Sequence, residues 1–498
     1  MISATQLYDL VQCPHRVALD VFGDQSLSDE PNAFVQLLWE QGVDHEVNIA
    51  ASLHISINIR QTPIVDRERE TLAAMRRGEQ LIYGGRLTSG DLVGEPDLLQ
   101  RRGDGYIPGD IKSGSGFEGE DDDAKLKKHY AYQLAHYILI LDQLGLGDGS
   151  REAFVIDRHG ERVPYVLTEP QSVRNTETWW DSYLQALAEG RAILEQTQPT
   201  RGALCAHCKL CYWHSYCKQD LVAQDDLTLI AELGRSKRDT MIQTIPTVQA
   251  LAAIDPDGFV QGKKTAFSGI GPDSLRKFHE RARLLSTPGA TAYLKGDVQL
   301  PVAAKEVYFD IEADPMRDVV YLHGFVERLH GQPATARFIP LFAEGIDPAQ
   351  EQAVFRQAWE YLNLRVQDSI IYYYSKYERT AYKKLAQKYP DMCSVADVET
   401  LFALPSMVDL LYDVVVKATE WPTYDRSIKT LAQHLGFQWR DTHPSGAASI
   451  EWYHRWIESG DPAIKQRILD YNEDDCLATG VVVDGIRAIR VDNRAGPV

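Results

Sequence analysis

The sequence has no long apolar run, and this absence excludes a membrane-spanning helix, which needs about 20 such residues. Its start also lacks the basic and apolar regions of a secretory signal, and Ser3 and Gln6 have the spacing of a helix capping box instead. Basic residues are in the minority, with 52 Lys and Arg against 71 Asp and Glu, so the net charge is −19. That charge argues against a general nucleic-acid coat protein, which would be basic.

Cysteine is scarce, with 7 in 498 residues. The lack of a signal predicts a cytoplasmic protein, in which cysteines more often bind metal or lie buried than form disulfides. The remaining composition, 44% hydrophobic and 25% charged, is that of a globular chain. No internal repeat is present.

The length predicts about three domains, and the order of helical and strand patterns predicts an α/β fold class with a helical middle segment. The first covers residues 1–222, with helical patterns up to about 50 and again from 124 to 145, and short strands between 81 and 114. A helical, polar segment covers 223–298. The third domain covers 299–498, opening with a strand at 307–312 and closing on a helix that carries Tyr471.

A first set of polar residues lies in the 1–222 segment. Asp110 and Lys112 are two apart on a predicted strand, so both side chains project to one face. A carboxylate that holds Mg²⁺ beside an amine that positions water is a combination suited to hydrolysis. Asp97, which follows the turn Gly94-Glu95-Pro96, can supply a second carboxylate.

Three further residues extend this set. His45 falls on the same helical stripe as Phe34 and Leu38, so we expect it to face inward as a further ligand. Gln133 and Tyr137 are four apart on a predicted helix and share a face suited to orienting the lysine, water or phosphate. Each is weak evidence alone, because inward histidines and polar pairs also occur in ordinary cores. Together and in this order, the five elements favour a catalytic site over ordinary core positions. They are His45, Asp97, the Asp110–Lys112 pair, Gln133 and Tyr137.

Taken together, these motifs resemble the PD-(D/E)XK nucleases of the RecB type, above all the CRISPR-associated exonucleases and AddB-like enzymes with an iron–sulfur cluster. The resemblance spans nearly all of residues 1–220. It implies a restriction-endonuclease-like fold. It also implies that His45, Asp97 and Asp110 bind Mg²⁺ or Mn²⁺, that Lys112 acts with them on water, and that Gln133 and Tyr137 form the helix motif that follows.

Four cysteines lie at the two ends of this domain, at positions Cys13, Cys208, Cys211 and Cys217. One early cysteine and a late Cys-x2-Cys-x5-Cys match the family's pattern, which implies a structural [4Fe–4S] cluster. Four thiolates also suit tetrahedral zinc. In the zinc alternative, Cys205 could serve as the fourth thiolate ligand in place of Cys13. His207 and His214 also lie near these cysteines in the sequence.

In the central segment, Gly269-Ile270-Gly271 resembles the turn of a helix-hairpin-helix, whose backbone N–H groups bind DNA phosphates. A simple glycine turn with Pro272 opening a helix is an equal alternative.

A second set of acids lies in the 299–498 segment. Along 307–312, Asp310 and Glu312 share a strand face with Tyr308, while Val307, Phe309 and Ile311 face the other way. Two acids side by side repel unless cations hold them. Glu378 is the best third acid, and Asp475, one helical turn after Tyr471, the best fourth. Asp409 and Asp474 are alternatives, although Asp409 has the position of a helix cap.

This pattern resembles the DEDD exonucleases of the DnaQ-like, ribonuclease H-fold class that use a tyrosine. The resemblance covers residues 303–490 and implies that Asp310, Glu312, Glu378 and Asp475 bind two metals while Tyr471 orients water. The usual asparagine motif at the third acid is absent here, and Glu378 stands without it.

The two halves together, with Ser427-Ile428-Lys429, resemble the bacterial RecB-like nuclease family. The resemblance implies a metal-dependent DNA nuclease with two sites, an exonuclease acting on single-stranded ends, in repair, recombination or phage defence. Its expected partner is DNA with single-stranded or duplex ends. Because the sequence has no G-x-x-x-x-G-K-[ST] loop, unwinding would need a separate helicase. The alternatives are a DNA-binding scaffold that recruits such a helicase, and a C-terminal half that acts on RNA.

Overall fold

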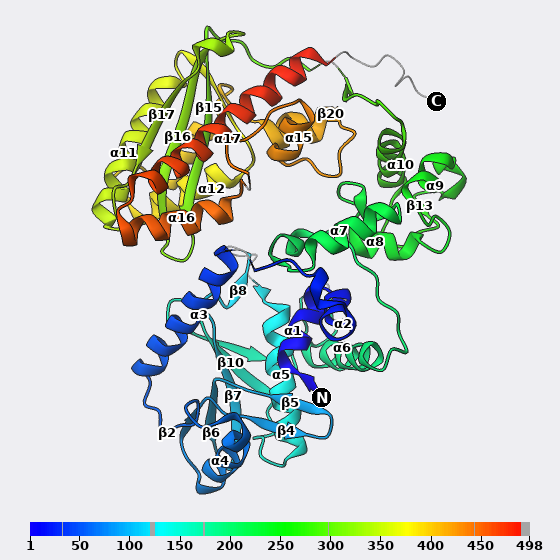
Figure 1. The fold of residues 1–498 in the computed structure, drawn as a ribbon, viewed down its shortest axis with the longest axis vertical. Coiled ribbons are helices and arrows are strands. Elements are labelled where there is room, and N and C mark those ends of the chain that lie inside the picture. The colour runs from blue at the N-terminus through cyan, green and yellow to red at the C-terminus, as the bar shows by residue number, and fades with distance from the viewer. Residues whose placement is uncertain (32, 120–124, 173–174, 297, 443, 490–498) are drawn as a thin grey trace. The chain divides into compact units, whose positions relative to one another are not determined.

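The computed structural model describes the chain except for residues 32, 120–124, 173–174, 297, 443 and 490–498. It divides into two compact units (Figure 1). The first contains residues 1–202 and 206–219, and the second contains 203–205 and 220–498. The central segment predicted over 223–298 therefore lies within the second unit.

The first unit is built on two mixed sheets. Its six-stranded sheet has the order β11-β10-β7-β6-β3-β2, and a three-stranded sheet has the order β1-β5-β4. These strands are β1 (Ile2–Ser3), β2 (Ile57–Asn58), β3 (Leu81–Tyr83), β4 (Leu87–Ser89), β5 (Leu92–Gly94), β6 (Leu98–Arg102), β7 (Gly105–Ile111), β10 (Glu152–Ile156) and β11 (Arg162–Val166). A separate hairpin pairs β8 (Phe117–Glu118) with β9 (Lys125–Leu126).

The helices of this unit are α1 (Ala4–Gln12), α2 (Pro14–Phe22), α3 (Ala33–Ser52), α4 (Ile64–Arg77), α5 (Lys128–Gln143), α6 (Trp179–Leu194) and α7 (His214–Ala223), which continues past residue 219. The predicted capping box is confirmed. Ser3 Oγ accepts from the Gln6 N–H, and Gln6 Oε1 accepts from the Ser3 N–H.

Helix α5 lies at the centre of the first unit, in contact with strands of both sheets and with α1 and α6. Ten of its 16 residues are buried. The fully buried His136 donates from Nε2 to the carbonyls of Ile2 and Val93, at 3.1 and 3.2 Å, so α5 also holds β1 and β5. Helix α5 therefore presents Gln133 and Tyr137 from a rigid support.

The last segment of the first unit is tied to α2. The Tyr212 hydroxyl and the Trp213 indole N–H both donate to Asp20 Oδ1, at 2.8 and 2.7 Å. Trp213 is 1% exposed, and the backbone N–H of Ser215 donates to Asp29. These contacts join residues almost 200 positions apart and close the unit on itself.

The second unit begins with short helices: η4 (Leu227–Leu229), α8 (Gly234–Met241), α9 (Val248–Ala253), η5 (Pro256–Phe259) and α10 (Pro272–Ser286), with a hairpin of β12 (Val260–Gln261) and β13 (Lys264–Thr265) before α10. The purely helical expectation for this segment is therefore wrong in part, because the polar Gly262 turn pairs two short strands. Pro272 does open a helix, capped by Gly271. DNA binding at this turn stays a prediction.

A five-stranded sheet of order β17-β16-β15-β18-β19 forms the core of the second unit. Its strands are β15 (Lys305–Asp314), β16 (Val319–Leu329), β17 (Arg337–Phe342), β18 (Ser369–Tyr373) and β19 (Met407–Asp409). The first three are antiparallel neighbours, and β15, β18 and β19 run parallel. Away from this sheet, β14 (Tyr293–Leu294) pairs with β20 (Thr419–Glu420).

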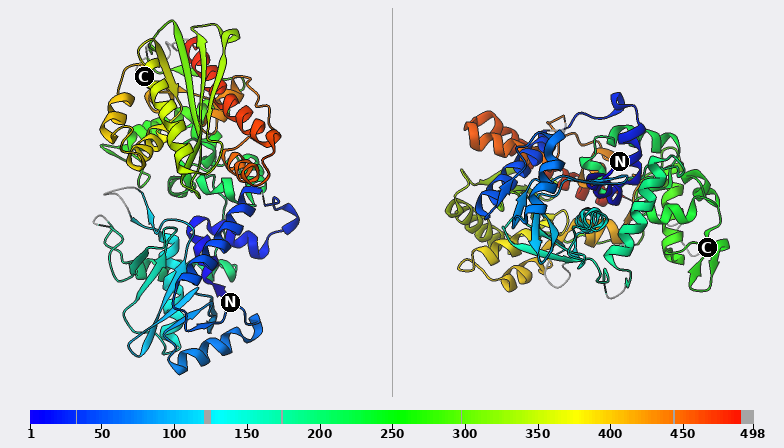
Figure 2. Two further views of the ribbon diagram at one scale, coloured as in Figure 1. Left: turned by 90° about the vertical axis from the view of Figure 1, so that its left-hand side faces the viewer. Right: turned by 90° about the horizontal axis from the view of Figure 1, so that it is seen from below.

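Helices cover both faces of this sheet (Figures 1 and 2). One apolar core packs α11 (Pro348–Arg365), α12 (Tyr377–Lys388) and α13 (Val395–Phe402) on Val307, Phe309 and Ile311. The other packs α15 (Ile428–His434), α16 (Gly446–Ser459) and α17 (Pro462–Ala488) on Tyr308. A π-helix (Leu410–Val415) and α14 (Val416–Ala418) follow β19. The predicted alternation along residues 307–312 is confirmed.

Among the residues that the structure describes, no helix is both long and apolar enough to span a bilayer.

Candidate functional sites

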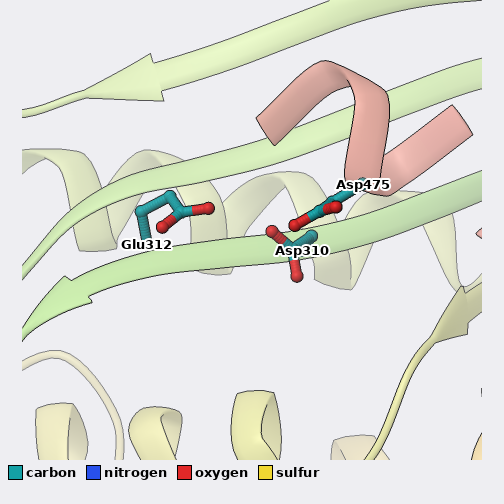
Figure 3. A group of neighbouring side chains, drawn as sticks. All are labelled: Asp310, Glu312 and Asp475. Carbon is teal, nitrogen blue, oxygen red and sulfur yellow. The ribbon is translucent and has the colours of Figure 1, made fainter. Parts of the chain in front are cut away.

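The second unit holds a compact acidic cluster. Asp310 and Glu312 project from β15, and Asp475 from α17 (Figure 3). One carboxylate oxygen of each lies within 4.8 Å of the other two, and in the described part of the chain this is the only such group of three or more metal-binding side chains. Oxygen donors at this spacing suit hard divalent cations such as Mg²⁺ and Mn²⁺.

Burial and mutual repulsion make this cluster electrostatically costly without a cation. Burial, and then the charge of Asp475, raise the pKa of Glu312 to about 8. Burial, and then the charges of Asp475 and Glu312, raise the pKa of Asp310 well above its usual range. Burial also raises the pKa of Asp475, against the opposing charge of Lys429. Such a cluster gains stability from a bound cation.

Glu378, the predicted third acid, lies in the first turn of α12 and is 2% exposed. Its charge contributes to raising the pKa of Asp310, so the two carboxylates are neighbours, although Glu378 is not one of the three closest. Burial, with the charge of Asp409 as a lesser cause, raises the pKa of Glu378 to about 8. Ser375, just before α12, has a φ of 113°, a strained value for a non-glycine residue.

The alternatives considered for the acids have other roles in the structure. Asp409 Oδ1 accepts from the Tyr412 N–H at 2.9 Å, so it caps the turn after β19 as expected. Asp474 accepts from the backbone and side chain of Arg440, at 2.8 and 2.9 Å. Neither belongs to the close cluster.

Several contacts that sequence analysis missed position the acids. The Trp439 indole N–H donates to Asp475 Oδ1 and the Asn472 amide donates to Asp310 Oδ2, each at 2.7 Å. Asn472 lies in the predicted Tyr471–Asp475 turn of α17, so its neighbours in sequence could have indicated it. Trp439, on a loop, gave no signal.

In the first unit, the predicted residues form a chain of contacts. Lys112 Nζ lies 3.0 Å from Asp110 Oδ2 and donates to Gln133 Oε1 at 2.8 Å. Gln133 in turn donates to the Tyr137 hydroxyl at 3.1 Å. Asp97 Oδ2 accepts from the Ile111 N–H at 2.9 Å, which places this carboxylate beside β7.

Burial and neighbouring charges shift the pKa values of two residues at this site. Burial, and then the charges of Asp110 and Glu46, raise the pKa of Asp97 to about 8. Burial lowers the pKa of Lys112, but the charges of Asp110 and Asp97 outweigh it and the pKa is raised overall. Without a bound metal Lys112 is therefore a cation, and its N–H groups can hold water or phosphate oxygen.

His45 lies apart from the closest contacts of the first site. Its Nε2 donates to the Asp157 carbonyl at 3.2 Å, which leaves Nδ1 as the nitrogen able to bind a metal. Within the described residues, no group brings His45 within 4.8 Å of two acids, so its role as a ligand stays a prediction.

Glu46, the neighbour of His45 on α3, was not predicted from the sequence as part of the site. Glu46 accepts from the Tyr83 hydroxyl at 2.9 Å and pairs with Arg60 at 2.8 Å, and Arg60 lies 3.9 Å from Asp97. The signal was an acid directly after the histidine.

The cysteines of the first unit come from both of its ends. Cys13 links α1 to α2, Cys208 lies in η3 (Ala206–Leu210), Cys211 follows it, and Cys217 lies in α7. Burial raises the pKa of the Cys211 thiol and the charge of Cys13 adds to this, which indicates that these two side chains are near one another. All four are partly buried, whereas Cys205 is exposed.

Two family models match the chain. Residues 2–218 match the PD-(D/E)XK nuclease superfamily, and residues 307–486 match the RNase_H superfamily. The chain therefore contains an N-terminal PD-(D/E)XK nuclease domain and a C-terminal RNase H-like domain. No curated protein matches the sequence. Two domains from these superfamilies support a hydrolytic nuclease, and the acidic cluster of the RNase H-like domain has the donors that divalent metals need.

Proposed function

We propose that the protein is a metal-dependent deoxyribonuclease with one hydrolytic site in each domain, acting on DNA from single-stranded ends. The observation that carries this proposal is the close group of Asp310, Glu312 and Asp475 within the RNase H-like match. Buried acids that repel one another cost stability, and a site for divalent cations accounts for that cost.

In the RNase H-like domain, Asp310, Glu312, Glu378 and Asp475 would hold Mg²⁺ or Mn²⁺. A bound pair of such cations supplies an acidified water and neutralises charge on the phosphate. Tyr471, which is 4% exposed and one turn before Asp475 on α17, would orient the attacking water with its hydroxyl. Trp439 and Asn472 hold the acids in place through their N–H groups.

In the PD-(D/E)XK domain, His45, Asp97 and Asp110 would hold the cation. The Lys112 ammonium would position water and phosphate oxygen beside it. Gln133 and Tyr137 fix that ammonium, since the Gln133 amide accepts from Lys112 and donates to Tyr137. The order of these contacts supports the roles that the sequence motif predicts.

We further propose that Cys13, Cys208, Cys211 and Cys217 hold a structural [4Fe–4S] cluster. Thiolates from α1–α2 and from the 206–219 segment fit a group that joins the two ends of the domain, where Tyr212 and Trp213 already bond to Asp20. Protein purified without oxygen should be brown and absorb blue light, and Cys13→Ser should lose this colour. Colourless protein with stoichiometric zinc would contradict the cluster.

A cleavage assay on labelled single- and double-stranded DNA and on RNA, with Mg²⁺ or Mn²⁺, tests the main proposal. Lys112→Ala and Asp310→Ala should each remove one activity, and the double variant should remove both. The exposed residues Lys128 and Glu458 provide matched controls, and their alanine variants should cleave normally. Loss with Lys112→Ala alone would assign cleavage to the first domain.

If no version cleaves any substrate, the nuclease proposal fails and a DNA-binding scaffold that recruits a helicase becomes the better account. Cleavage of RNA alone would instead correct the substrate.

A further inference from the structure

A lysine next to the acidic cluster has contacts that the proposed roles do not use. Ser427 caps α15 by accepting from the Thr430 N–H, which fixes Lys429 in the first turn. Lys429 Nζ donates to the Tyr471 hydroxyl and to the Pro444 carbonyl, each at 2.8 Å. The ammonium also lies 4.7 Å from the centre of the Tyr471 ring. A flexible side chain is thus held in one position at the site.

The position of Lys429 is electrostatically directed at the cluster. Its charge opposes the burial and repulsion that raise the pKa values of Asp310, Glu312 and Asp475. A cation that serves only to neutralise the acids would pair directly with one of them. Among the described residues, Lys429 instead donates to a neutral hydroxyl and a carbonyl.

The donor count leaves one N–H for a ligand. An ammonium has three N–H donors, and the contacts with Tyr471 and Pro444 occupy two of them. Because the Tyr471 oxygen accepts from Lys429, the phenol proton points elsewhere, and Asp475 has a hydrogen bond with this hydroxyl. Lysine is a compact charge of the kind that binds phosphate oxygen.

We propose that Lys429 is a substrate-positioning residue of the RNase H-like site. Its third N–H binds a non-bridging oxygen of the scissile phosphodiester, and its bond to Tyr471 fixes the phenol oxygen, whose second lone pair accepts a hydrogen bond from the attacking water. This inference rests on the proposed function of the domain. The competing explanation is structural, since the same two contacts join α15 to the segment before α16 and to α17.

The test uses the Lys112→Ala protein, in which only the RNase H-like site is expected to act. Cleavage of a labelled single strand with Mn²⁺ gives kcat and KM for Lys429→Met, Lys429→Arg and Tyr471→Phe, and for the Lys429→Met and Tyr471→Phe pair. Lys417→Met is the matched control, because this lysine is exposed on α14 and pairs with Asp413. Melting curves report folding, and anisotropy with Ca²⁺ reports binding without cleavage.

Lys429→Met should lower kcat roughly 100-fold, a loss typical of removing one donor to a developing charge. The kcat of Lys429→Arg should be at least tenfold higher than that of Lys429→Met, because arginine keeps the positive charge. The pair of substitutions should be no more than about threefold worse than Lys429→Met alone, since the Tyr471 hydroxyl acts on water only while Lys429 fixes it. The slope of log affinity against log salt should fall by about 0.7, as for one phosphate contact in a single strand.

If the parent is active and Lys429→Met changes neither kcat nor the slope of log affinity against log salt, this inference is overturned, and the proposed function still stands. A fall in melting temperature without recovery by arginine and without a change in salt slope would assign Lys429 a structural role and overturn it too. If the Lys112→Ala parent cleaves no nucleic acid, the proposed activity of the RNase H-like domain fails, and this inference fails with it.

Discussion

The acidic cluster should make the metal-free protein less stable as the pH rises, and Glu312→Gln should remove part of this effect. Burial and Asp475 raise the pKa of Glu312 from 4.5 to about 8. Below pH 4.5 both folded and unfolded Glu312 hold a proton. Between pH 4.5 and about pH 8 only the folded state keeps the Glu312 proton, so the folding stability falls as the pH rises from 4.5 to about 8.

The pKa of Glu312 differs by about 3.5 between the folded and unfolded states. At 1.36 kcal/mol per pKa unit, this difference corresponds to about 5 kcal/mol of folding free energy, as an upper bound. Because Asp310 and Asp475 share the same repulsion and relax when one charge is removed, we expect Glu312→Gln to gain about 2–3 kcal/mol at pH 8.5 in EDTA. At pH 5 the gain should be small, since folded Glu312 is then already neutral. Saturating Mn²⁺ should reverse the order, because only the intact cluster binds it well.

Hydrogen exchange of the β15 amides measures this unit by itself, which matters because a chain of two units need not unfold in one step. Glu458→Gln, an exposed change on α16, serves as the control and should leave exchange unchanged. Equal or faster exchange in Glu312→Gln than in the parent at pH 8.5 would refute the reasoning, as would an equal gain in the control.

Three other changes have defined outcomes. Trp439→Phe removes the N–H donated to Asp475 and should weaken Mn²⁺ binding about tenfold or more in calorimetry, because hydrogen bonds to charged groups are worth about 1.5–3 kcal/mol. Gly324→Ala would make a Cβ collide with the buried Asn472 amide, so urea unfolding should show a loss of about 2 kcal/mol or more. Ser375→Gly relieves the φ of 113° and should stabilise the second unit by about 1 kcal/mol in the same assay; a loss would show that the serine is not strained.

The parts of this structure that sequence analysis could predict follow short-range rules. The capping box at Ser3 and the alternation along β15 depend on residues two or three apart, so the pattern alone specifies them. Asp310 and Glu312 share a face for the same reason. The cap at Asp409 likewise depends on the next few residues.

The residues that sequence analysis missed reach the sites through long-range packing. Trp439 is 36 positions before Asp475 and lies on a loop, so no periodicity connects them. The hairpin at Gly262 was missed because its strands are only two residues each and carry no alternating pattern. Glu46 stands beside a predicted ligand, yet its contacts with Tyr83 and Arg60 depend on the register of β3 against its neighbours.

The bond between Trp213 and Asp20 has a consequence for folding during synthesis. The two residues are 193 positions apart, so α2 emerges from the ribosome long before its partner exists. At about 5–20 residues per second, this delay is about 10–40 s. During that time Trp213 is not available to pack against Asp20 on α2. A nascent chain released early would therefore expose this part of α2 to proteases and chaperones.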